Sequence, residues 1–216
     1  MKIKQFTFNK MRENCFVVWD EADGTAAVVD PGCADAQEQQ ALAGFLAQAG
    51  ACPRAVLVTH PHFDHVVGAG WLCRTYGLAC HVCAPDRPLT AKLGELAKLY
   101  DFPLEAMDIP FLFFEEAPQT LRFGSLEVQV LPLTGHTPGS VAYYFPAAEA
   151  VCVGDTVTKG SLGFLETGFG QTLERIRDYL LPLPDGTLLC PGHGACSTIG
   201  AERDANRFFK RSQALG

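Results

Sequence analysis

The stretch LVTHPHFDHVVG, Leu57–Gly68, decides how the rest of the chain is interpreted. Three of the six histidines and one aspartate lie here within six residues, directly after the apolar run VLVT. Neutral imidazole and carboxylate are groups that bind Zn²⁺, Fe or Mn. A cluster of these groups after a β-branched run predicts part of a metal site, whose other ligands must come from elsewhere in the chain.

Three further polar motifs also follow apolar runs. VQVLPL precedes the loop with His136, AVCVG precedes Asp155, and LLCPG precedes His193. Loops at strand ends often carry function in layered α/β proteins, because the sheet holds them rigidly. Five of the six histidines lie in these four motifs, and only His81 lies elsewhere, in LACHVCA. We expect the four motifs to converge on one site and His81 to be a packing residue.

The predicted site holds five histidines and two aspartates: His60, His62, Asp64, His65, His136, Asp155 and His193. Seven groups exceed the four ligands of a tetrahedral zinc, whereas two metals that share one carboxylate would use all of them. Two metals ~3.5–4 Å apart are a recurring hydrolytic device that lowers the pKa of bound water toward ~7. Burying so many unpaired groups would cost several kcal/mol. The set therefore predicts two Zn²⁺ per chain, with Fe or Mn as alternatives.

The composition favours a globular protein that acts on a small molecule. The chain has 216 residues and a net charge of −7, with no Lys/Arg run, so neither nucleic acid nor an anionic membrane is an expected partner. No signal-peptide pattern or 18-residue apolar stretch occurs, which predicts a cytoplasmic protein. The oligomeric state stays open. Nine cysteines are expected as free thiols, and Cys80 and Cys83 as packing residues on opposite faces of one strand.

Strand-like and helix-like segments alternate along the chain, which predicts one α/β layered domain over residues 1–216. The first thirty residues predict an antiparallel meander, and a β-hairpin is expected over 120–133. Other strands are expected at 54–60, 78–84, 140–146, 150–155 and 187–192. Helices are expected at 36–50, 66–77, 86–100 (with Asp86 as N-cap), 171–183 and 201–215, the last ended by Gly216. The run 110–116 fits a strand or a buried helix.

The four motifs, HPHFDH at 60–65, GHTPG at 135–139, GDT at 154–156 and PGHG at 191–194, occur in the order typical of one family. In this order they resemble the metallo-β-lactamase fold superfamily, and most closely its glyoxalase II-like (hydroxyacylglutathione hydrolase-like) branch. The resemblance implies an α/β fold, a four-layer αββα sandwich in which two mixed β-sheets face each other and helices flank them.

The resemblance also implies a division of ligands. His60, His62 and His136 would hold one metal, Asp64, His65 and His193 the second, and Asp155 would bridge both. Asp64 and Asp155 are also the expected catalytic residues, since they would hold the metals and orient the attacking hydroxide. Asp30 resembles a residue that orients a ligand histidine, although a plain turn aspartate fits its position equally well.

The activity implied is hydrolysis of a thioester of a hydroxyacyl group by a metal-bound hydroxide. A thiol of pKa ~8.5 leaves without a strong acid, so no general acid is required. The chain departs from the branch at Phe164 and Glu166, where Arg and Asp are usual, and Lys159 is the nearest basic replacement. The alternatives are a mononuclear iron persulfide dioxygenase, using the equivalents of His60, His136 and Asp155, and a lactonase or phosphodiesterase. A metal-binding module without activity is disfavoured, because the full ligand set is present.

Overall fold

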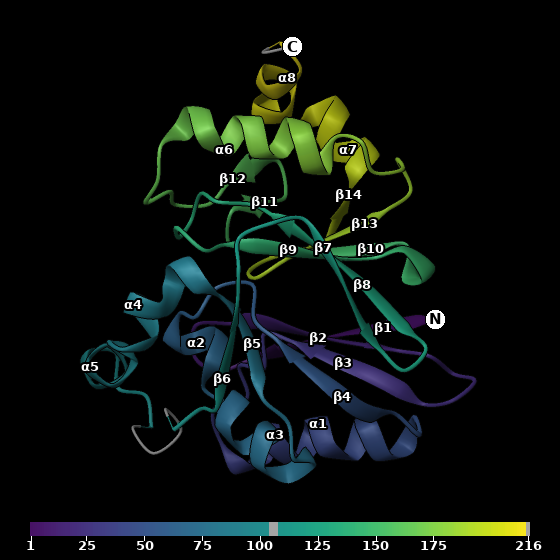
Figure 1. Cartoon of the computed structure of the whole chain (residues 1–216), viewed down its shortest axis with the longest axis vertical. Coiled ribbons are helices and arrows are strands. Elements are labelled where there is room, and N and C mark those ends of the chain that lie inside the picture. Colours follow the sequence, from purple (N-terminus) through teal and green to yellow (C-terminus); the bar gives the residue numbers. More distant parts are fainter. Residues whose placement is uncertain (104–107, 215–216) are drawn as a thin grey trace.

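The computed structural model describes residues 1–103 and 108–214. Its strands form two six-stranded sheets that face each other, and helices cover the outer face of each sheet (Figure 1). The predicted four-layer αββα sandwich of two mixed sheets is confirmed. Within the described residues, no helix combines the length and the apolar character needed to cross a membrane.

The first sheet has the order β1-β2-β3-β4-β5-β6. Its strands are β1 (Lys2–Phe8), β2 (Glu13–Trp19), β3 (Thr25–Val29), β4 (Cys52–Leu57), β5 (Cys80–Cys83) and β6 (Phe111–Phe114). The first two pairs are antiparallel and the last three are parallel. Helices α1 (Ala36–Gln48) and α3 (Ala69–Tyr76) return the chain between parallel strands and cover this sheet. Asp35 begins α1 by accepting a 2.9 Å hydrogen bond from Glu38 N.

The second sheet has the order β14-β13-β10-β9-β8-β7. Its strands are β7 (Gln119–Phe123), β8 (Leu126–Pro132), β9 (Val141–Phe145), β10 (Ala150–Gly154), β13 (Leu188–Pro191) and β14 (Ser197–Thr198). Only β10 and β13 run parallel. Its outer face is covered by α6 (Phe169–Arg175), the π-helical turn η4 (Ile176–Leu180), α7 (Ile199–Ala205) and α8 (Arg207–Gln213). A short hairpin, β11 (Val157–Thr158) and β12 (Ser161–Leu162), follows β10.

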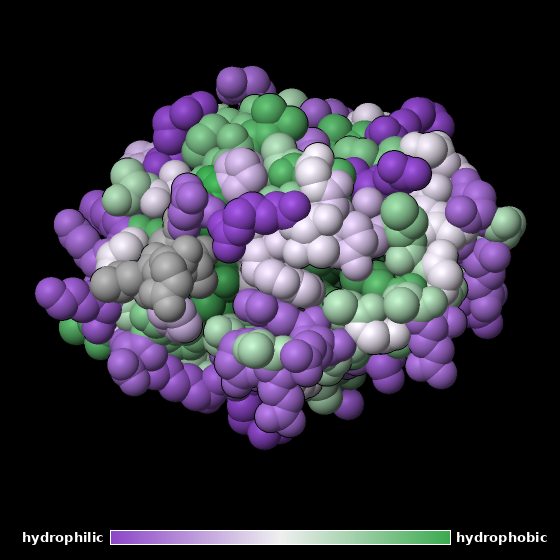
Figure 2. Space-filling model, turned by 90° about the horizontal axis from the view of Figure 1, so that it is seen from below, coloured by the Kyte–Doolittle hydropathy of each residue, from purple (hydrophilic) through white to green (hydrophobic). Residues whose placement is uncertain are grey.

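Three apolar cores lie between these layers. One lies between the sheets and includes Phe16 and Tyr143; the other two lie between each sheet and its helices. Strand β5 contributes to two of them, because Cys80 packs on the helix side and Cys83 packs between the sheets. The prediction of packing cysteines on opposite faces is confirmed, and all nine cysteines are free thiols. Seen from the side of α1 and α3, hydrophilic side chains are prominent around the rim of the molecule (Figure 2).

Two predicted helices differ from the structure. The helix expected over 86–100 is three short pieces, η1 (Ala84–Asp86), α4 (Arg87–Thr90) and α5 (Leu93–Leu99). Asp86 precedes α4, but its side chain makes no capping hydrogen bond, because it is used on another loop. The last helix is divided at Asn206, whose extended backbone ends α7 and whose side chain accepts from Phe208 N to begin α8. The predicted end at Gly216 lies outside the described residues. The run 110–116 contains strand β6.

Candidate metal centre

The four motifs meet where strands of both sheets end. His60 follows β4, His62 precedes the short helix α2 (Phe63–Val66), and Asp64 and His65 lie on it. From the second sheet come the loops after β8, β10 and β13, which carry His136, Asp155 and His193. The structure thus brings all seven predicted residues together, and their side chains form overlapping groups close enough to share a metal ion.

The first triad is a set of three imidazoles. His62 Nδ1 lies 3.0 Å from His60 Nε2 and 2.9 Å from His136 Nε2. Three ring nitrogens at these distances cannot all be satisfied by one another, because a neutral ring offers one donor and one acceptor. Burial and the neighbouring His136 lower the pKa of His62 to about 4, so this ring is neutral near pH 7. Neutral imidazoles with converging nitrogens are what a divalent cation requires.

Hydrogen bonds on the far side of two rings fix which nitrogen faces the centre. The carbonyl oxygen of Phe164 accepts a hydrogen bond from His136 Nδ1 at 2.7 Å, so Nε2 is the ring nitrogen left to face the centre. The Thr59 hydroxyl donates to Asp30 Oδ2 at 2.7 Å, which leaves its oxygen to accept from His60 Nδ1 at 3.1 Å. His60 Nε2 is therefore also free to bind an ion. Partners of this kind orient histidine ligands in metal sites.

The second triad contains Asp64, His65 and His193, and Asp155 lies between the two triads. His193 Nε2 is 3.2 Å from Asp64 Oδ2 and 3.4 Å from Asp155 Oδ2. The carboxylate of Asp155 also lies 3.6 Å from His65 Nε2 and 3.8 Å from His136 Nε2. Asp155 is thus within reach of ligands from both triads, as a bridging carboxylate would be.

Several buried polar atoms of this centre lack a hydrogen-bond partner in the described protein. They include both ring nitrogens of His65 and Oδ1 of Asp155. Burial by itself would raise the pKa of Asp155, but His65 and His193 hold it well below its usual range, so the carboxylate is charged. Unpaired buried groups are costly, and a cation among them would offset that cost. The donor set therefore fits two metal ions, and the ligand role of each residue stays a prediction.

Gly192 is a position where a side chain would not fit. A Cβ built there would contact Asp155 Oδ1 and lie 2.6 Å from His65 Cε1. Real Cβ atoms do not approach other atoms so closely. The glycine before His193 therefore lets the β13 loop pass directly against two predicted ligands.

Two carboxylates lie behind His65. Asp30 is 2% exposed, and its Oδ2 lies 3.2 Å from His65 Nδ1. This is an ion-pair distance without hydrogen-bond geometry, and it favours an orienting role over that of a plain turn residue. Glu13, which we did not single out in the sequence, is fully buried, and neither carboxylate oxygen has a hydrogen-bond partner. Its side chain, with Asp30 and His65, forms a further group of possible metal ligands, and burial raises its pKa well above the usual range. A charged residue beginning the buried strand ENCFVVW was the available signal.

Five of the seven predicted ligands line a hollow of about 550 Å³: His62, Asp64, His136, Asp155 and His193. Its apolar wall comes from Met11, Phe63, Leu89, Leu96 and Tyr100, and its charged rim residues are Lys92 and Glu166. Lys159 lies instead on the exposed β11–β12 turn and does not line this hollow. The basic residue beside the site is therefore Lys92. The Phe164 side chain is 76% exposed, and only its carbonyl oxygen serves the centre.

The fold and this geometry agree with comparisons to known proteins. Residues 9–193 match the model of the metallo-beta-lactamase superfamily. The chain belongs to this superfamily. It is 28% identical to hydroxyacylglutathione hydrolase GloC of Haemophilus influenzae, over 97% of this chain and 98% of that protein. The resemblance seen in the sequence is confirmed, and the chain is a metallohydrolase of this superfamily.

Two solved structures of the superfamily cover almost the whole chain. The BLEG-1 B3 metallo-beta-lactamase has a TM-score of 0.80 and 29% identity, covering 95% of this chain and 98% of that one. TTHA1623 in a di-iron-bound form has a TM-score of 0.78 and 30% identity, covering 95% and 99%.

Proposed function

We propose that this metallohydrolase cleaves a thioester of a hydroxyacyl group, with the two triads and Asp155 holding two divalent cations. The observation that carries the proposal is the position of Asp155 between two complete ligand triads, members of both of which line one hollow. The similarity to a hydroxyacylglutathione hydrolase over nearly the full length supports the substrate class. The imidazole-rich donor set favours zinc, and iron or manganese are the alternatives.

Bound metals would supply Lewis-acid activation of water and of the substrate carbonyl at neutral pH. The protein's contribution is placement. Thr59 and the Phe164 carbonyl oxygen fix the tautomers of His60 and His136 before any ion binds. Asp64 and Asp155 line the hollow, so their carboxylates can accept a hydrogen bond from the attacking water and orient it.

The hollow suits a leaving group that needs no proton from the enzyme. Its wall between Met11 and Tyr100 is largely apolar, which excludes water from the acyl group. The titratable residues of the described lining, other than the predicted ligands and Tyr100, are Lys92 and Glu166. A thiol with a pKa of ~8.5 leaves as thiolate, so a thioester requires no further acid, whereas an amide would.

The direct test couples metal analysis to a thioester assay. We expect two zinc ions per chain and hydrolysis of S-lactoylglutathione or a related acyl-thiol. Asp155→Ala should lose metal and activity together, because it removes the carboxylate that both triads share. Full activity with full metal content in that variant would refute the scheme.

Persulfide oxidation at a single iron is the second candidate. The 3.8 Å separation of His136 Nε2 and Asp155 Oδ2, two of the three ligands this chemistry would use, favours it. The similar structure of TTHA1623 also holds iron, but in a di-iron form. One iron per chain, with oxygen consumption on a persulfide and no thioester hydrolysis, would establish this activity in place of the first.

A further inference from the structure

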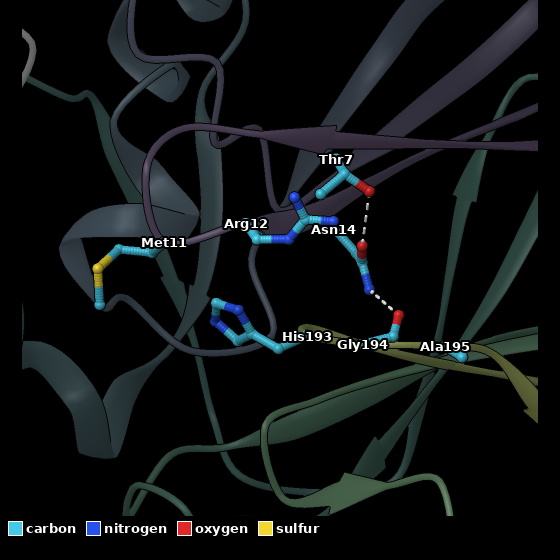
Figure 3. A pocket seen from close by; sticks show the side chains of 7 residues that line it. All are labelled: Thr7, Met11, Arg12, Asn14, His193, Gly194 and Ala195. Atoms are coloured by element: carbon cyan, nitrogen blue, oxygen red, sulfur yellow. Dashed lines mark hydrogen bonds between the residues drawn. The ribbon is translucent and has the colours of Figure 1, made fainter.

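A second hollow, of about 500 Å³, adjoins the first on the side of the β1–β2 turn (Figure 3). Met11 and His193 line both hollows, so the second begins where the predicted metal centre ends. Arg12 and Asn14 come from the β1–β2 side, and Gly194 and Ala195 form the opposite wall after β13. Both hollows fall within the usual size of ligand pockets, about 300–1,000 Å³.

The turn that carries Arg12 is fixed to the metal centre. The side-chain amide of Asn9 donates to the carbonyl oxygens of Gly32 at 2.9 Å and Asp64 at 3.0 Å. Its carboxamide oxygen also accepts from Met11 N, and Arg12 N donates to Asn9 O. Arg12 has a φ of +58°, a left-handed conformation that costs a non-glycine residue on the order of 1 kcal/mol. The anchored turn therefore holds the arginine beside the hollow in a conformation that its own backbone does not prefer.

The charge of Arg12 is not used by the protein. Within residues 1–103 and 108–214, no ion pair or hydrogen bond involves its guanidinium group. The lining of this hollow includes no carboxylate, whereas in the neighbouring hollow Lys92 is accompanied by Glu166. Arg12 is exposed, so in a chain with a net charge of −7 its guanidinium is open to an anionic ligand that enters this hollow.

The other polar residue of this wall is already satisfied. Asn14 is 1% exposed; its amide donates to the carbonyl oxygens of Pro191 at 3.0 Å and Gly194 at 2.9 Å. Its carboxamide oxygen accepts from Gln5 and Thr7. Asn14 thus joins the two sides of the hollow as a rigid wall, whereas the guanidinium of Arg12 keeps its donors for a ligand.

We propose that this second hollow is a binding site for an anionic group, a carboxylate or a phosphate, at the far end of the substrate. The guanidinium fork binds both groups through two parallel N–H···O hydrogen bonds. The inference rests on the proposed function in one respect: the thioester itself would lie in the first hollow, on the other side of His193.

The test compares one acyl group on three thiols: glutathione, which carries carboxylates, coenzyme A, which carries phosphates, and N-acetylcysteamine, which carries neither. Arg12→Gln should lower the preference in kcat/KM for an anionic over the neutral thioester by about tenfold, mainly through KM. Arg12→Lys should restore part of it, and Lys159→Gln, which changes an exposed lysine outside both hollows, should leave it unchanged. Whichever anionic thioester shows the larger loss identifies carboxylate or phosphate as the group bound.

Direct binding separates this proposal from the proposed function. S-methylglutathione and desulfo-coenzyme A have no free thiol to bind metal, and their affinities are measured by calorimetry on the metal-loaded protein. Tenfold weaker binding of either compound to Arg12→Gln supports the site even if no thioester is hydrolysed. Binding that is absent from the wild type, or equal in the wild type and Arg12→Gln, overturns it, as does an equal loss of kcat/KM on charged and neutral thioesters.

Discussion

Asp86 should control the stability of the loop that carries His136. This aspartate lies on η1, is 1% exposed, and accepts hydrogen bonds from the Thr137 hydroxyl at 2.6 Å and from Gly139 N at 2.7 Å. A hydrogen bond to a charged group contributes about 1.5–3 kcal/mol, so the pair contributes about 3–6 kcal/mol. Burial raises the pKa of Asp86, because removing the carboxylate from water costs free energy, and this cost offsets part of the hydrogen-bond contribution. We therefore expect Asp86→Ala to lower the free energy of unfolding by about 3 kcal/mol.

Asp86→Asn separates hydrogen bonding from charge. The asparagine oxygen can accept from Gly139 N, and its amide can donate to the Thr137 oxygen, whose proton can turn to Ser140 Oγ at 2.8 Å. Both buried partners stay satisfied, so the loss should be about 1 kcal/mol.

The assay is urea unfolding of the metal-free protein, followed by circular dichroism. Asp204→Ala, at an exposed helix position, is the control and should change stability by less than about 0.5 kcal/mol. An Asp86→Ala variant as stable as this control would refute the reasoning. An Asp86→Asn variant as unstable as Asp86→Ala would show that charge, and not the hydrogen-bond pattern, holds the loop.

Two further changes test the centre and its surroundings. Gly192→Ala should weaken metal binding by about 10–100-fold, because the added methyl displaces Asp155 and His65. Gly168→Ala is the control, since a Cβ there meets nothing within 4 Å. Metal affinity is measured by titration against a chelator, and equal affinities of the two variants would contradict the prediction. Burial lowers the pKa of His81 in the folded protein. Below about pH 6.5 the unfolded chain therefore binds more protons at this residue than the folded protein does, and the free energy of unfolding decreases as pH falls through that value. His81→Gln should remove that part of the pH dependence in urea unfolding at pH 7.5 and 5.5 (about one unit on each side of 6.5), and an unchanged dependence would contradict it.

The convergence of the predicted ligands on one site was predictable because each motif is local. His60 to His65 lie on one loop and helix turn, and the other three predicted ligands each follow a short apolar strand. Strand ends carry rigid loops in this class of fold, so the position of a histidine after an apolar run indicates where it lies. The fold was predictable because strands and helices alternate along the chain, and each type has its own periodicity of apolar residues.

The helices were less predictable where tertiary contacts decide the backbone. Asp86 has the sequence position of an N-cap, but a hydrogen bond to Gly139, 53 residues later, outweighs the local one. Asn206 interrupts a segment with helical periodicity, because its side-chain amide is held by Glu202 at 2.8 Å and by the Ser161 carbonyl oxygen at 3.1 Å. Propensity is a weak prior, and tertiary contacts override it at such positions.

The walls around the substrate follow a different logic from the centre. Arg12 belongs to a turn near the N-terminus, Lys92 to the break between α4 and α5, and Glu166 to the loop before α6. No short motif links them, because they meet only after both sheets have formed. A substitution in one of these segments can therefore change the walls of the two hollows while the ligand geometry on the other side of His193 stays intact. Enzymes of one fold vary in specificity through their loops for this reason. The role proposed for Arg12 follows this logic, since its positive charge would favour an anionic ligand that the net charge of −7 alone would repel.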